Sequence, residues 1–201
     1  MTSGFTKVCS GVQPFEISMR NLIFALSLIL SSAALVRAGE LAVSTTVPVV
    51  VVAPDGWQSA KDQSPLSAAA PFETFKVFPP AGRNAVCLVS ILDRDKPAYA
   101  APAMLKKILR GDCRPYVGTA AELPNVELKE LKIGGGLGFY ANFIDPDLLG
   151  KPATSGAYKT ATPIILSIGA KVLIKATILC DDLNGADYRQ AFQMVESLKM
   201  K

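Results

Sequence analysis

Residues 158–180, with the sequence YKTATPIILSIGAKVLIKATILC, decide the fold class of this chain. They contain two apolar runs, 158–168 and 171–180, which are separated only by Gly169 and Ala170. β-Branched residues favour strands, and a two-residue connection that contains glycine favours a hairpin. The stretch therefore predicts two consecutive antiparallel strands.

The same strand signal occurs at five other places. Turn residues, including Pro54-Asp55-Gly56 and a glycine cluster at 134–136, separate the runs from one another. The five further strands are predicted at 47–53, 72–78, 84–93, 126–133 and 137–144. Residues 58–71 are polar and interrupted by proline, so we expect a loop or a short helical turn there.

Two segments have helical periodicity. Apolar residues within 99–110 form one face, with Pro102 marking the beginning of the helix and Gly111 its end. Near the C-terminus, Asn184 is the expected N-cap, and Asp187 lies in the first turn, where the helix dipole favours an acid. The expected buried stripe of this last helix is Tyr188, Ala191, Phe192, Val195 and Leu198.

These elements predict an α+β fold. Hairpins build an antiparallel sheet, and a sheet face and a helix stripe must each be buried against another element. We therefore expect a single α+β domain over residues 39–201, in which helices pack on the faces of an antiparallel sheet as an α/β/α sandwich.

The segment 19–38 has the features of a secretory signal peptide. Arg20 precedes an apolar run at 22–36, and small residues surround Ala38, after which cleavage is expected. The run is too short to span a bilayer, which takes about 20 apolar residues. We therefore expect an exported protein, periplasmic or extracellular, without a stable membrane span after cleavage.

Residues 1–18 precede this signal and have mixed polarity. Either they form an unusually long n-region, or translation starts at Met19 and residues 1–18 are an extension of the gene model. The second interpretation is favoured, because the segment has the character of neither a folded element nor an ordinary n-region.

Three motifs together resemble the PsbP-like and DcrB-like domains. They are the Pro54-Asp55-Gly56-Trp57 turn, the glycine hairpin at 134–140 and the closing helix with 192–198. The resemblance covers roughly residues 45–199. It implies an antiparallel sheet sandwiched by helices, and a role as an exported binding or assembly factor without a shared catalytic set.

Composition excludes several classes of function. The sequence has no histidine, which excludes Ser-His-Asp and Cys-His catalysis and every His-ligated metal or haem. Residues 39–201 carry 18 Lys and Arg against 16 Asp and Glu, interspersed rather than clustered. Nucleic acid is therefore not an expected partner, and no cofactor is expected.

Three cysteines remain in residues 39–201, and an exported chain favours disulfide formation. Cys87 lies within an apolar run and is expected to stay free as a small buried hydrophobe. Cys113 in a loop and Cys180 at the end of a strand are better placed to pair. We therefore expect one disulfide between Cys113 and Cys180.

Two further patterns each have two interpretations. The glycine cluster at 134–136 could cradle a phosphate, but it lies between strands and lacks the P-loop spacing, which favours a tight turn. Asp145 and Asp147, with Asp181 and Asp182, could supply oxygen ligands to calcium. Turn chemistry and a favourable helix dipole are the stronger interpretation of these acids, so no metal site is expected.

Tyr140, Asn142 and Tyr158 are the candidate ligand-binding residues. If the strands 137–144 and 158–168 pair in a suitable register, these polar tips share one face above an apolar floor and can build a small-molecule pocket. The alternative is that the tyrosines edge the core with their hydroxyl groups in water.

Two functions remain. The first is a non-enzymatic exported binding or assembly factor for an unidentified envelope or secreted protein. The second is an enzyme that uses the Cys113 thiol or acidic residues. The first is favoured, because neither a Gly-x-Ser-x-Gly nor a Ser-x-x-Lys nor a Cys-x-x-Cys motif occurs.

Overall fold

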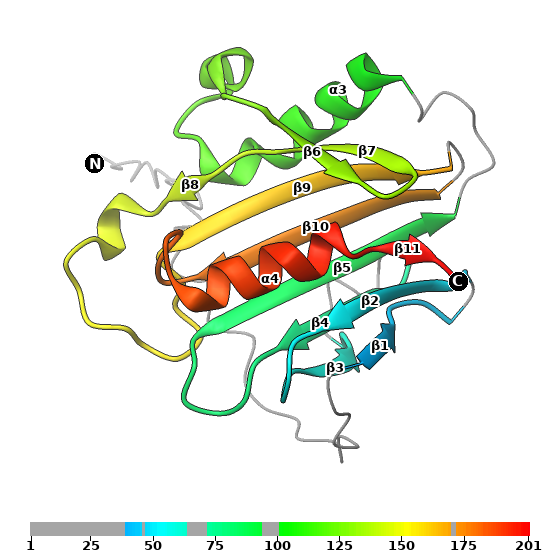
Figure 1. Cartoon of the computed structure of the whole chain (residues 1–201). Coiled ribbons are helices and arrows are strands. Elements are labelled where there is room, and N and C mark those ends of the chain that lie inside the picture. Colours follow the sequence, from blue (N-terminus) through cyan, green and yellow to red (C-terminus); the bar gives the residue numbers. More distant parts are fainter. Residues whose placement is uncertain (1–38, 46, 64–71, 94–100, 170–171) are drawn as a thin grey trace, which may run out of the picture.

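An antiparallel sheet of eight strands organises the part of the chain that the structure describes (Figure 1). The structure is a computed structural model, and it describes residues 39–45, 47–63, 72–93, 101–169 and 172–201. The strands are β3 (Gln58–Lys61), β4 (Thr74–Phe78), β5 (Ala85–Asp93), β6 (Lys129–Ile133), β7 (Gly136–Tyr140), β8 (Phe143–Ile144), β9 (Thr160–Ile168) and β10 (Val172–Cys180). Their spatial order is β3-β4-β5-β10-β9-β7-β6, and β8 also pairs with β9.

The hairpin predicted at 158–180 is confirmed, and it lies in the middle of this sheet. β9 and β10 pair antiparallel from Thr160↔Cys180 to Ile168↔Val172. Every residue of β9 is buried. The consecutive residues Ile164 and Ile165 pack into different core clusters, one on each face of the sheet. The run is apolar throughout because both of its faces are covered.

Helix α3 (Pro102–Asp112) covers one face of the sheet. Its residues Leu105 and Leu109 are fully buried in a cluster with Ile165 of β9 and Leu173 of β10. Pro102 begins the helix as predicted, because proline fits the first turn, where no backbone N–H is needed. The helix extends to Asp112, which forms an ion pair with Lys175 of β10 at 2.5 Å.

The opposite face carries helix α4 (Ala186–Glu196) and a second, three-stranded antiparallel sheet. The second sheet has the order β1-β2-β11, with β1 (Gly39–Ala42), β2 (Val49–Ala53) and β11 (Lys199–Met200). Figure 1 shows α4 lying along β10 and β5, with the chain leaving it into β11 beside β2. The expected stripe of α4 is confirmed at Ala191, Val195 and Leu198, which are buried, whereas Tyr188 and Phe192 are half-buried.

Two local expectations are wrong. Residues 58–61 form strand β3 instead of a loop, because pairing with β4 outweighs their polar composition. The N-cap of α4 is Gly185 instead of Asn184, and it makes no side-chain cap. Asp182 accounts for the difference, since its carboxylate accepts from Asn184 N at 2.8 Å and its carbonyl from Gly185 N at 3.1 Å. Residues 64–71 lie outside the described ranges.

Glycines in the β6–β7 hairpin meet two separate steric demands. Gly135 has φ of +80°, a conformation that side chains other than glycine rarely adopt. A Cβ on Gly138 would lie 2.8 Å from Leu166 Cβ, so the absence of a side chain lets β7 approach β9 closely. The tight-turn interpretation of this glycine cluster is therefore confirmed.

Antiparallel sheets with a few helices make this an α+β fold, as predicted. None of the helices in the described ranges is long and apolar enough to cross a membrane. The predicted signal segment 19–38 and the preceding residues 1–18 lie outside the described residues.

Candidate binding site

Asn142 joins three elements on the α4 side of the main sheet. It lies between β7 and β8, and its Oδ1 atom accepts hydrogen bonds from Thr162 Oγ1 at 2.9 Å and from Tyr188 OH at 3.2 Å. Thr162 is a fully buried residue of β9, and Tyr188 belongs to the first turn of α4. Two donors on different elements therefore hold the Asn142 carboxamide in one orientation.

This orientation presents the amide group of Asn142 to solvent. Asn142 is exposed, and both donors approach its oxygen. No other residue of the described ranges is hydrogen-bonded to the Asn142 side chain. Nδ2 therefore offers two N–H donors, held in a fixed direction, to a bound molecule.

Three half-buried aromatic rings lie beside Asn142. Tyr140 of β7 meets Phe192 of α4 edge to face, with ring centroids 4.9 Å apart, and Phe192 meets Tyr188 at 5.7 Å. All three rings pack against the core cluster on the α4 side of the sheet. We call Tyr140, Asn142, Thr162, Tyr188 and Phe192 the Asn142 site.

The phenol of Tyr188 acts in this site as a hydrogen-bond donor. Burial raises the pKa of Tyr188, while its hydrogen bonds with Thr162 and Asn142 act in the opposite direction. Because the net shift is upward, Tyr188 stays protonated at neutral pH. Its O–H group donates a hydrogen bond to Asn142 Oδ1.

Tyr158, the third residue predicted for this site, makes its contacts elsewhere. Burial raises the pKa of Tyr158, and the Asp181 carboxylate adds to that rise. Asn84 anchors this neighbourhood by donating from Nδ2 to Asp181 Oδ1 at 3.0 Å and to Ala157 O at 3.1 Å. Since β9 begins only at Thr160, Tyr158 lies before the strand, in a segment that Asn84 holds.

The structure thus brings Tyr140 and Asn142 together and replaces Tyr158 by residues of α4. Tyr188 and Phe192 were expected in the buried stripe of the last helix, but the structure leaves both half-buried. A sequence signal for their second role existed, because an aromatic residue with a hydroxyl tip suits the boundary between core and solvent.

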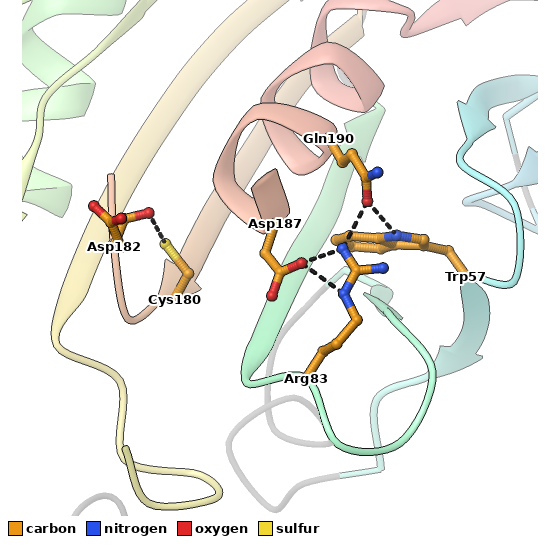
Figure 2. Close-up of polar contacts among 6 residues, drawn as sticks. All are labelled: Trp57, Arg83, Cys180, Asp182, Asp187 and Gln190. Carbon is orange, nitrogen blue, oxygen red and sulfur yellow. Dashed lines mark hydrogen bonds and ion pairs between the residues drawn. The ribbon is translucent and has the colours of Figure 1, made fainter. Parts of the chain in front are cut away.

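Cys180 lies next to the site, at the end of β10. Its thiol is 3.0 Å from Thr160 Oγ1. The thiol also donates weakly to Asp182 O at 3.6 Å, and Figure 2 shows this contact. Burial raises the pKa of Cys180, and its hydrogen bonds with Thr160 and with the Asp182 backbone counteract this rise in part. The Cys180 side chain is a protonated, buried thiol at neutral pH.

The expected disulfide between Cys113 and Cys180 is not formed. Cys87, Cys113 and Cys180 are all buried free thiols. Cys113 packs with α3 on one face of the sheet, whereas Cys180 shares its face with Ile178 and Ala176 on the α4 side. The sheet separates the two sulfur atoms, which a disulfide would have to bring within bonding distance. Cys87 is free, as predicted.

A polar cluster fixes the beginning of α4 beside the site. Figure 2 shows Arg83 reaching Asp187 and Gln190 of this helix, with Trp57 against them. Arg83 Nε donates to Asp187 Oδ1 at 2.6 Å, and Gln190 Oε1 accepts both from Arg83 Nη2 at 2.7 Å and from Trp57 Nε1 at 3.2 Å. The orientation of α4, and with it that of Tyr188, therefore depends on this cluster.

Of the four acidic residues considered as calcium ligands, Asp145 and Asp182 each serve a local turn. Asp145 Oδ1 accepts from Asp147 N at 2.9 Å, and Asp182 Oδ1 accepts from Asn184 N at 2.8 Å. The Asp181 carboxylate accepts from Asn84 Nδ2. Within the described ranges, no three acidic or cysteine side chains converge as a metal site would require.

Comparison with known proteins gives a similar fold and no family. No family model matches the chain, and no curated protein sequence matches it. A crystal structure of a Bacteroides thetaiotaomicron protein at 1.50 Å resolution is similar, with a TM-score of 0.51 and 13% sequence identity. The match covers 82% of this chain and 49% of that one, so this chain spans about half the length of the solved structure. At this identity the likeness concerns the fold alone.

Proposed function

We propose that this protein is an exported, non-enzymatic binding or assembly factor, with an α/β/α sandwich of the PsbP-like or DcrB-like kind. The three motifs at 54–57, 134–140 and 192–198 support this family assignment. The positions of α3 and α4 in clusters on opposite faces of the sheet support the sandwich arrangement.

The observation that carries the binding function is the fixed carboxamide of Asn142. Its oxygen is held by Thr162 and Tyr188, while its amide group is exposed beside the half-buried rings of Tyr140 and Phe192. Aromatic rings with oriented, uncharged donors suit a partner that offers a carbonyl or hydroxyl acceptor next to an apolar group. A loop of an envelope or secreted protein has this chemistry.

The thiol-enzyme alternative is not favoured by the cysteines. A reactive cysteine needs an accessible thiolate, which a lowered pKa provides. Burial instead raises the pKa of Cys87 to about 12 and that of Cys113 to about 11. Cys180 is shifted in the same direction. None of these three buried cysteines therefore carries the accessible thiolate that nucleophilic attack requires.

Export remains part of the proposal. N-terminal sequencing of the exported protein should begin at Gly39 or within about two residues of it. A soluble mature form that keeps residues 22–36 would refute cleavage.

Quantitative affinity purification from the envelope of the exporting cell tests the binding function. Asn142→Ala removes the oriented donors and should deplete the partner that the wild type retains. Gln193→Ala is the matched control, because Gln193 is an exposed residue of α4 one position from Phe192. Equal recovery with the wild type and Asn142→Ala, while both are folded, would overturn the Asn142 site as the binding surface.

A further inference from the structure

Strand β6 forms one open edge of the main sheet (Figure 1). It pairs with β7 on one side, from Lys129↔Tyr140 to Ile133↔Gly136. No strand within the described ranges pairs with its other side. An open edge leaves backbone donors and acceptors free, and another strand can pair with them.

The charged residues of β6 lack strong partners, unlike those on the other sheet edges. Among the described residues, Glu130 and Lys132 form an ion pair only with each other, at 4.0 Å, and their side chains are 52% and 88% exposed. On β3, by contrast, Lys61 is paired with Glu73 at 2.7 Å, and on β1 Glu40 is paired with Lys199 at 2.6 Å. Beyond their mutual contact, no described residue neutralises Glu130 or Lys132.

We propose that β6 pairs antiparallel with β6 of a second copy of this chain, about a two-fold axis at Leu131. The strand sequence is Lys129-Glu130-Leu131-Lys132-Ile133. With Leu131 opposite its own copy, Glu130 faces Lys132 of the partner subunit, and Lys132 faces Glu130 of the partner subunit. Each dimer therefore gains two cross-strand pairs of opposite charge.

The neighbouring registers are excluded by charge. In an antiparallel sheet, residues directly opposite each other lie on the same face. The two-fold axis that relates the two copies of β6 must therefore pass through a residue and not between two residues, so the neighbouring registers have their axes at Glu130 and Lys132. An axis at Glu130 would place that residue opposite its own copy, and an axis at Lys132 would do the same for the lysine. Both arrangements oppose like charges, which destabilise a strand pair. The register centred on Leu131 is the one that pairs opposite charges.

The two faces of the junction have different character. Leu131 and Ile133 belong to the core cluster on the α4 side, so Glu130 and Lys132 project from the other face, where α3 lies. The dimer would therefore place Leu131 beside its copy on one face and both charge pairs on the other. This contact is isologous and closes after two copies.

Sedimentation equilibrium of the purified protein over a concentration series tests the dimer, with thermal unfolding as the control for folding. Glu130→Lys and Lys132→Glu each oppose like charges at both ends of the junction, and each should weaken self-association by about tenfold or more. The double variant Glu130→Lys/Lys132→Glu restores opposite charges and should dimerise like the wild type. Lys107→Glu, an exposed change on α3, should leave self-association unaltered.

Mixing the two single variants gives the sharpest result. The Glu130→Lys chain carries lysine at both 130 and 132, and the Lys132→Glu chain carries glutamate at both positions, so the two variants should associate with each other more tightly than either does with itself. A wild-type protein that remains monomeric up to about 1 mM would overturn the proposal. A dimer that both single variants leave unchanged would also overturn it, because the interface would then lie elsewhere.

Discussion

Arg83 and Asp187 are 104 positions apart in the sequence, and Arg83 Nε donates to Asp187 Oδ1 at 2.6 Å. Arg83 precedes β5, whereas Asp187 lies in the first turn of α4, where the helix dipole favours its charge. Trp57 joins the same cluster, with Arg83 above its ring at 5.7 Å and Gln190 on its indole N–H. Three separate segments are therefore fastened where α4 begins.

Removing this ion pair should destabilise the fold. Arg83→Ala leaves the half-buried Asp187 carboxylate without its charged donor, and we expect a loss of about 1 to 3 kcal/mol in the free energy of unfolding. Urea unfolding followed by fluorescence measures it directly, because Trp57 is the only tryptophan. Lys107→Ala, an exposed change on α3, should stay within about 0.5 kcal/mol.

A double-mutant cycle checks the cause of that loss. If the ion pair is responsible, Arg83→Ala and Asp187→Ala combined should cost less than the sum of the single changes. Strict additivity would mean that the two residues stabilise the protein independently.

Helix α4 should depend most on Met194. Met194 is fully buried, and Met194→Ala should cost about 2 to 5 kcal/mol. Replacing a fully buried core phenylalanine with alanine costs about 3 to 5 kcal/mol of unfolding free energy. Phe192→Ala should cost less, because the Phe192 ring is half-buried. Gln193→Ala lies between them on the exposed face and serves as the control in the same unfolding experiment. A larger loss for Phe192→Ala than for Met194→Ala would contradict the observed burial.

Glu73 should make stability depend on acid. Lys61 Nζ lies 2.7 Å from Glu73 Oε1, and Thr45 donates from its hydroxyl group and backbone N to Oε2. The hydrogen bond from Lys61 and those from Thr45 lower the pKa of Glu73 from its ordinary value of 4.5 to about 2. A lowered folded-state pKa stabilises the fold fully above the unfolded value. This stabilisation is then lost as the pH falls from about 4.5 towards 2.

Thermal unfolding across that pH range measures the effect. The melting temperature of Glu73→Gln should start lower at neutral pH, and its difference from the wild type should shrink as the pH falls. A constant difference between pH 6 and about 2 would show that the ionised carboxylate of Glu73 contributes nothing.

The three buried thiols should be silent in the native protein. With the chain cleaved after Ala38, Ellman's reagent at neutral pH should label none of Cys87, Cys113 and Cys180 until the protein is unfolded. Unfolding without a reductant should then expose all three. Only one reactive thiol after unfolding would mean that the protein contains a disulfide, contrary to the structure.

The strands formed by long β-branched runs could be predicted from local sequence, and β9 and β10 are the clearest case. The short strands β1, β3 and β11 could not, because pairing with a neighbouring strand, and not their own sequence, determines them. Met200 of β11, for example, pairs with Val49 of β2. A two-residue strand has no periodicity to detect.

The binding site shows the same limit. Tyr140 and Asn142 share one stretch of chain, so their proximity could be predicted. The contact between Asn142 and Tyr188 spans 46 positions and depends on how α4 lies on the sheet. The sequence favours Tyr158 as the third residue of the site, because it lies next to the strand that pairs with β7. The hydrogen bonds of Asn84 instead hold the Tyr158 segment away from Asn142.

Site-specific photo-crosslinking in the exporting cell tests the central claim, that the Asn142 site binds a partner. A photoreactive amino acid at position 144, an exposed position of β8 two residues from Asn142, should capture one defined envelope or secreted protein. The same group at position 193 on the exposed face of α4 should not. Adding Asn142→Ala to the position-144 variant should abolish the capture, because the oriented donors are then missing. Equal capture from 144 and 193, or none from 144 with the protein folded and exported, would contradict the account.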